Sequence, residues 1–228
     1  MTSVRKNPAN ASKKLSALLR KLGSGSPPRD LPPADDPIAT IIVSMLLWDS
    51  TTEKAIGGFQ KLMNEAVDYN DLRVCMPHET MEILGVRYPR VQERSQRLRA
   101  VLRSIYLREH AVSLNALKSQ GKREVKKYIE SLDGITPFAA NRVLLLSFDT
   151  HGIPVDEQLK ELLVDAEVCE PEVEIPDLTA WLASQVRAED AAGTHYALQA
   201  WSDKHGSGGS SGRTVVSRKS AGTPARRG

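Results

Sequence analysis

Cysteine is scarce in this sequence of 228 residues, which contains only Cys75 and Cys169. Two thiolates cannot supply the four ligands of an iron–sulfur cluster or of a cysteine-rich zinc site. His78 and His151 also lack the spacing to other ligand residues that would suggest metal binding. We therefore expect no metal site and no cofactor. The two cysteines are typical of unpaired thiols in a reducing compartment.

Long hydrophobic runs are absent as well. The longest, from Ile38 to Leu47, is interrupted by Thr40 and Ser44 and is far shorter than the roughly twenty residues that span a bilayer. The N-terminus is basic but has no apolar stretch ending in a cleavage site of small residues, so we expect no secretory signal. These absences predict a protein of the cytoplasm that has no membrane partner.

The alternation of apolar and polar residues that marks β-strands is missing over useful lengths, and this absence predicts an all-α fold. The composition is ordinary for a globular protein, with 40% hydrophobic and 26% charged residues. A chain of this length can bury one substantial core or two small lobes that pack together.

Acidic residues are absent from both ends of the chain, although the net charge is only +3. Residues 1–22 carry six basic residues and residues 205–228 carry five, which leaves 20 basic residues against all 28 acidic ones between them. A fold that wraps nucleic acid with its whole surface would not have an acidic middle. Any contact with nucleic acid is therefore expected at local basic patches and at the ends.

Helices are expected wherever apolar residues recur every three to four positions between capping signals. Ser12 is a candidate N-cap for a first helix ending at Leu22, and Asp36 with Pro37 starts a second that is apolar on all sides. That second helix should be the buried centre of the fold. Further helices are expected at 53–66, 71–75, 78–84, 89–109, 121–132, 137–148, 156–164, 176–186 and 189–204. Residues 1–10 and 205–228 are predicted to be basic and disordered.

The segment from Leu132 to Asn141 joins two of these helices by a tight hairpin. Gly134 can adopt a positive φ there, Thr136 can cap the second helix, and Pro137 can begin it. Free backbone N–H groups converge at such a helix start and can hold a phosphate oxygen. Beyond the second helix, Gly152 and Pro154 lead to Asp156 at the start of another helix. An Asp at this position can be a simple N-cap or a carboxylate placed for chemistry.

On these residues the sequence resembles the helix-hairpin-helix (HhH-GPD) superfamily of base-excision DNA glycosylases, and is similar to its endonuclease III-like branch. The resemblance extends from Lys13 to Trp201, through the segments 38–51 and 84–103, the hairpin and Asp156. It implies a two-lobed helical fold over residues 11–204, with one lobe at about 37–155 and a second formed by 11–23 and 156–204. It also implies double-stranded DNA as the partner, and we expect a monomer.

The same resemblance assigns roles to individual residues. Asp156 would face the sugar of a base flipped into the cleft between the lobes, where a fixed anion stabilises the positive charge of glycosidic cleavage. Gly134 and Thr136 would clamp a backbone phosphate, and Ser50 would lie near the lesion. Members that also cut the strand have a nucleophilic lysine where this chain has Phe138, so no lyase step is expected. Thr136 replaces a second hairpin glycine, and Asp133 places a negative charge beside the phosphate site.

Basic residues near the hairpin are a second candidate DNA surface. Arg90, Arg94 and Arg97 fall on one face of the helix expected at 89–109, and Lys126 belongs to a basic group that precedes the hairpin. A solvated helix face and a contact with DNA phosphates are both compatible with this pattern.

Three functions therefore remain open at this point. The first is a monofunctional glycosylase that hydrolyses the N-glycosidic bond of a damaged or mispaired base through Asp156. The second is a catalytically inactive relative that recognises distorted DNA. The third is an interaction protein that has kept only the fold, which would suit the acidic middle of the chain.

Overall fold

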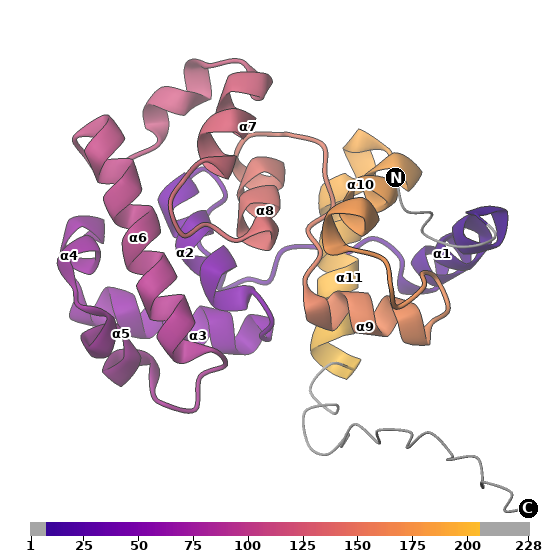
Figure 1. The fold of residues 1–228 in the computed structure, drawn as a ribbon, viewed down its shortest axis with the longest axis horizontal. Coiled ribbons are helices and arrows are strands. Elements are labelled where there is room, and N and C mark those ends of the chain that lie inside the picture. The colour runs from indigo at the N-terminus through magenta and orange to yellow at the C-terminus, as the bar shows by residue number, and fades with distance from the viewer. Residues whose placement is uncertain (1–7, 206–228) are drawn as a thin grey trace, which may run out of the picture.

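The computed structural model describes residues 8–205, which form eleven α-helices, two short 3-10 helices and no strand (Figure 1). The α-helices are α1 (Pro8–Leu22), α2 (Pro37–Leu47), α3 (Thr52–Glu65), α4 (Tyr69–Val74), α5 (Pro77–Leu84), α6 (Val91–Glu109), α7 (Lys122–Glu130), α8 (Pro137–Ser147), α9 (Glu157–Asp165), α10 (Ile175–Gln185) and α11 (Ala191–His205). The 3-10 helices are η1 (Asn115–Ser119) and η2 (Ala188–Asp190).

The first helix begins earlier than the sequence predicted. It starts at Pro8, so residues 8–10 are helical and the prediction of disorder is wrong for them. Ser12 is inside the helix, where its hydroxyl donates to Oε1 of Gln185 at 2.7 Å. The other residues predicted to be disordered, 1–7 and 206–228, lie outside the described residues. The 3-10 helix η1 was not expected.

The second helix is the centre of the larger lobe, as its apolar sequence predicted. Asp36 caps it by accepting hydrogen bonds from the N–H groups of Ile38 and Ala39, both at 3.0 Å. The hydroxyl of Tyr69 donates to the other oxygen of Asp36 at 2.6 Å. All eleven residues of α2 are buried, chiefly between α3 and α8. A helix without a polar face is stable in water only when it is covered on all sides in this way.

The buried side chains form two hydrophobic cores, which correspond to two lobes (Figure 1). The first core extends from Ile38 to Leu144, and the second unites Leu15 of α1 with residues from Leu145 onward. Ile153 and Val155, which the sequence assigned to the first lobe, are part of the second core. The chain therefore passes from one core to the other inside α8.

A buried polar network joins the two lobes. Arg142 of α8 donates from Nε to Nε2 of His195 in α11 at 3.1 Å, and from Nη1 to the hydroxyl of Ser44 in α2 at 3.0 Å. Arg142, His195 and Ser44 are each at most 3% exposed. Because hydrogen bonds between buried polar groups require defined geometry, this network fixes how α11 lies against α2 and α8.

No helix among residues 8–205 is long and apolar enough to cross a membrane. Within the same residues, His, Cys, Asp and Glu side chains do not gather in a group of three or more that could hold a metal ion.

Candidate active site and DNA interface

The hairpin between α7 and α8 packs tightly against α6. Gly134 has φ +82°, and a Cβ atom added there would come within 2.8 Å of the carbonyl oxygen of Arg97 and 2.9 Å of Cβ of Ala100. Glycine is therefore required for both the backbone conformation and the close approach. Thr136 caps α8 by accepting from the N–H of Ala139 at 3.2 Å, as the sequence predicted.

Two backbone N–H groups of the hairpin are free of protein acceptors. Those of Gly134 and Thr136 donate no hydrogen bond to another described residue. The hydroxyl of Thr136 is unavailable to a ligand, because the residue is only 2% exposed and its oxygen serves the cap. This value covers the whole residue, so the backbone N–H of Thr136 is shielded too, and the half-buried Gly134 has the more accessible of the two donors. The hairpin N–H groups are the kind of donors that bind phosphate oxygens at helix starts.

Asp156 lies at the N-terminus of α9, where the two lobes meet. Its Oδ1 accepts from the N–H of Leu159 in its own helix at 2.9 Å, and its Oδ2 accepts from the N–H of Asp49 in the first lobe at 3.0 Å. The residue is 4% exposed. Both interpretations from the sequence are therefore compatible with the structure, since the carboxylate is an N-cap and is also held at the junction of the lobes.

Burial raises the pKa of Asp156 to about 6. The nearby Asp49 carboxylate raises it further, whereas the hydrogen bonds from Leu159 and Asp49 lower it. A carboxyl group with a pKa near neutrality can hold or release a proton under physiological conditions, which is the property that general acid–base catalysis requires.

Asp49 is the partner of Asp156, and the sequence assigned it no role of its own. The hydrogen bonds run in both directions between the two segments, because Oδ1 of Asp49 accepts from the N–H of Glu157, the residue after Asp156, at 3.1 Å. The other oxygen of Asp49 lies 3.2 Å from Nη2 of Arg90. Asp49 and Arg90 both have left-handed backbone conformations, with φ of +48° and +50°. Such strain persists only where the surrounding contacts require it, and it is common at functional sites.

Arg94 is buried in the first lobe, and the prediction that it belongs to an exposed DNA-binding face is wrong. It is 0% exposed, and its guanidinium donates to the carbonyl oxygens of Met45, Trp48 (2.7 Å) and Pro89 (3.1 Å). Met45 and Trp48 are at the C-terminal end of α2, whose last carbonyl groups have no partner within the helix. Arg94 therefore closes the end of the central helix and is unavailable to DNA.

The other predicted basic residues remain partly or largely exposed. Side chains of Arg90, Arg97 and Lys126 are 45%, 38% and 54% exposed. Arg90 and Arg97 both pair with Glu93, and Arg97 also donates to the carbonyl of Gly134 at 3.4 Å. Surface ion pairs of this kind are weak and exchange readily for a phosphate. These three cations stay candidates for DNA contact.

Ser50 and Phe138 are both buried. Ser50 is 4% exposed, and its hydroxyl makes no hydrogen bond with another described residue. It directly follows Asp49, so it lies beside the junction that holds Asp156. Phe138 is 3% exposed and packs in the core of the first lobe. A phenyl ring in this position cannot form a Schiff base.

Sequence reasoning missed the polar groups whose partners are far away in the chain. Arg142 is the one charged residue of an otherwise apolar helix, and that isolation was a usable signal for a buried and paired cation. His195 is buried, and its imidazole accepts a hydrogen bond from Arg142. For Asp49 the only signal was its place in a segment that resembles the glycosylases.

Several solved structures are similar to this chain. Endonuclease III, trapped as a covalent intermediate with DNA, aligns with a TM-score of 0.63 and 14% identity over 86% of this chain and 85% of its own. The 8-oxoguanine glycosylase/lyase of Clostridium acetobutylicum aligns with a TM-score of 0.61 and 16% identity, over 87% of this chain and 71% of its own. A thermostable thymine-DNA glycosylase aligns with a TM-score of 0.60 and 16% identity, over 86% of this chain and 88% of its own.

No protein-family model matches the chain, and no curated protein is similar to it in sequence. The structural likeness is nevertheless consistent across these proteins and covers most of the described residues. Two helical lobes, a hairpin against α6 and a carboxylate between the lobes are all present. The chain therefore has the two-lobed, all-α fold of the helix-hairpin-helix DNA glycosylase superfamily.

Proposed function

We propose that this protein is a monofunctional DNA glycosylase of base-excision repair, which binds double-stranded DNA as a monomer and hydrolyses the N-glycosidic bond of a flipped base. The observation that carries the proposal is the place of Asp156, fixed by one backbone donor from each lobe. Cleavage of the glycosidic bond builds positive charge on the sugar, and a fixed carboxylate at a cleft stabilises that charge.

In the proposed reaction, the ionised Asp156 faces the sugar after the base has been extruded from the duplex. The same carboxylate can orient a water molecule or accept its proton as it attacks the anomeric carbon. Because Phe138 is apolar and buried, water is the nucleophile and the product is an abasic site in an intact strand. The hairpin N–H groups of Gly134 and Thr136, together with Arg90, Arg97 and Lys126, would hold the flanking phosphates.

The test uses duplexes that each contain one uracil, oxidised, alkylated or mispaired base. After incubation with the protein, half of each sample is treated with hot alkali, which breaks the strand at abasic sites. We expect breaks on at least one duplex only after alkali, and none with Asp156→Asn. The matched control is Asp68→Asn, which alters another capping carboxylate, at the start of α4. Breaks without alkali would contradict the absence of a lyase step.

A second candidate is a DNA-binding relative without catalysis. It is favoured by the burial of Asp156, whose two oxygens already accept hydrogen bonds from Leu159 and Asp49. Tight binding to distorted duplexes with no cleavage of any of them would support this candidate. Failure to bind any duplex at moderate salt would favour a protein that has kept only the fold.

A further inference from the structure

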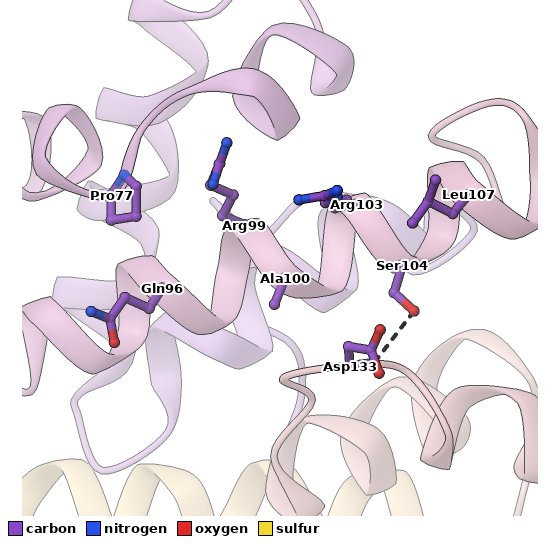
Figure 2. Close-up of a pocket in the computed structure, with 8 residues that line it drawn as sticks. All are labelled: Pro77, Gln96, Arg99, Ala100, Arg103, Ser104, Leu107 and Asp133. Atoms are coloured by element: carbon purple, nitrogen blue, oxygen red, sulfur yellow. Dashed lines mark hydrogen bonds between the residues drawn. The ribbon is translucent and has the colours of Figure 1, made fainter.

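A groove runs along the outer side of α6, apart from the site built around Asp156 (Figure 2). It has a volume of about 480 Å³ and extends between the start of α5 and Asp133 in the hairpin loop. Its lining residues are Pro77, Gln96, Arg99, Ala100, Arg103, Ser104, Leu107 and Asp133. The proposed function uses none of them.

Two arginines of this groove lack an acidic partner. Arg99 and Arg103 are one helical turn apart, make no ion pair with another described residue, and extend from the same side of α6 in Figure 2. Nε of Arg99 is buried without a hydrogen-bond partner in the described part of the chain. On the same helix, in contrast, Arg90 and Arg97 both pair with Glu93. Guanidinium groups with free donors bind carboxylates in a bidentate geometry.

Exposed apolar side chains lie near both ends of this groove. Leu107 lines the groove and is 62% exposed. Val74, the last residue of α4, is 52% exposed, and Met76, which directly precedes Pro77 at the other end of the groove, is 45% exposed. These three are among only five large hydrophobic side chains that are exposed in residues 8–205. Clustered exposed apolar groups beside arginines are typical of protein-binding surfaces.

We propose that this groove binds an acidic segment of another protein, with apolar side chains against Pro77 at one end and Leu107 at the other. Carboxylates of the segment would bind Arg99 and Arg103 between them. DNA fits the groove less well, because the exposed side chain of Leu107 gains nothing from contact with phosphates. The basic ends of this same chain are excluded by charge, since residues 1–22 and 205–228 contain no acidic residue.

The experiment selects random peptides displayed on phage against the full chain and measures the affinity of synthetic copies by fluorescence polarisation. We expect the selected peptides to place a large apolar residue beside Asp or Glu. The double variant R99A/R103A should bind them about tenfold more weakly or worse, as should Leu107→Ser. The matched control R29A/K61A removes two exposed cations elsewhere and should bind as the unaltered protein does.

Three results would overturn the proposal. One is a selection that yields no binders or only peptides without this pattern, and another is equal binding by R99A/R103A. The third comes from duplex DNA, measured over a range of salt concentrations. The groove belongs to the DNA surface if R99A/R103A leaves peptide binding unchanged and reduces the slope of log affinity against log salt concentration for duplex DNA. The expected reduction is then the amount that corresponds to about two phosphate contacts. Thermal unfolding of each variant shows that it remains folded.

Discussion

At the scale of single residues, Asp156 combines a structural and a chemical role. It caps α9 through Oδ1 and binds the first lobe through Oδ2, so removal of the carboxylate affects the junction of the lobes as well as any catalysis. Burial without a bound cation raises its pKa to about 6, which means that the folded protein binds a proton there more tightly than the unfolded chain does.

The raised pKa of Asp156 gives a prediction with two readouts. If the ionised form is the active one, the single-turnover rate should rise with pH through a midpoint of about 6. The contribution of Asp156 to stability is present in full below its unfolded pKa and is lost as pH rises through 6. Compared with Asp156→Asn, the wild type should lose up to roughly 3 kcal/mol of unfolding free energy between about pH 4 and about pH 7. Denaturant melts measure the difference in unfolding free energy between the wild type and Asp156→Asn. A difference that stays constant across this pH range would contradict the raised pKa of Asp156.

Gly134 tests the geometry of the hairpin. Gly134→Ala places a Cβ atom against the Arg97 carbonyl and in a left-handed conformation, so we expect a loss of about 1–3 kcal/mol of unfolding free energy. Gly57→Ala is the control, because Gly57 is inside α3 with no atom near a new Cβ, and alanine there should stabilise the helix slightly. Urea melts of the two variants measure both effects. Equal effects would mean that the hairpin does not need glycine.

At the scale of secondary-structure elements, α6 organises the first lobe by serving different neighbours along its length. Arg94 near its start closes the C-terminal end of α2, and its middle supports the hairpin at Gly134. Its outer side carries the groove of Arg99 and Arg103. A single helix therefore connects the central helix, the proposed phosphate clamp and the proposed docking surface.

Variants of Arg94 and Lys126 should distinguish a structural cation from one that binds DNA. Arg94→Met leaves backbone carbonyls of α2 unpaired, so it should lower the unfolding temperature and leave the salt dependence of duplex affinity unchanged. Lys126→Ala should keep the unfolding temperature and reduce that salt dependence by about one phosphate contact. Fluorescence anisotropy with labelled duplex across a salt series measures the slope. The reverse pattern would contradict the assignment of Arg94 as a structural residue.

At the scale of the whole molecule, the lobes are joined by the network of Arg142, His195 and Ser44. Burial, followed by the charge of Arg142, lowers the pKa of His195 well below its usual value, so the imidazole is neutral and accepts from Arg142. Any relative movement of the lobes would break these buried hydrogen bonds. The junction of the lobes is therefore held by buried hydrogen bonds between α2, α8 and α11.

His195 predicts a loss of stability in acid that opposes the effect of Asp156. Below about pH 6.5 the unfolded chain gains a proton at His195 and the folded protein does not, so stability falls as pH decreases through this value. His195→Gln keeps a hydrogen-bond acceptor and should flatten this dependence. His195→Phe leaves Arg142 without its acceptor and should cost about 1–3 kcal/mol at every pH. Calorimetric unfolding across pH would refute the role of His195 if all three proteins behaved alike.

Most of the fold was determined by local sequence. Helix caps such as Asp36 and Thr136 depend on residues only a few positions away, and so does the spacing of apolar residues. The helices of the structure follow these local signals closely. The hairpin and the place of Asp156 at the start of a helix were predictable for the same reason. The 3-10 helix η1 has no distinct local signal, whereas the true start of α1 has one that was overlooked, a proline at position 8 preceded by Asn7.

Only the tertiary structure decided which polar side chains are buried and what they bind. Arg94 and Arg97 looked alike in the sequence, yet one closes α2 and the other is exposed, because their surroundings come from helices far away in the chain. The contact of Asp49 with Asp156 joins residues more than a hundred positions apart. Periodicity describes which face of a helix is apolar, whereas a hydrogen bond between lobes depends on how the two cores pack.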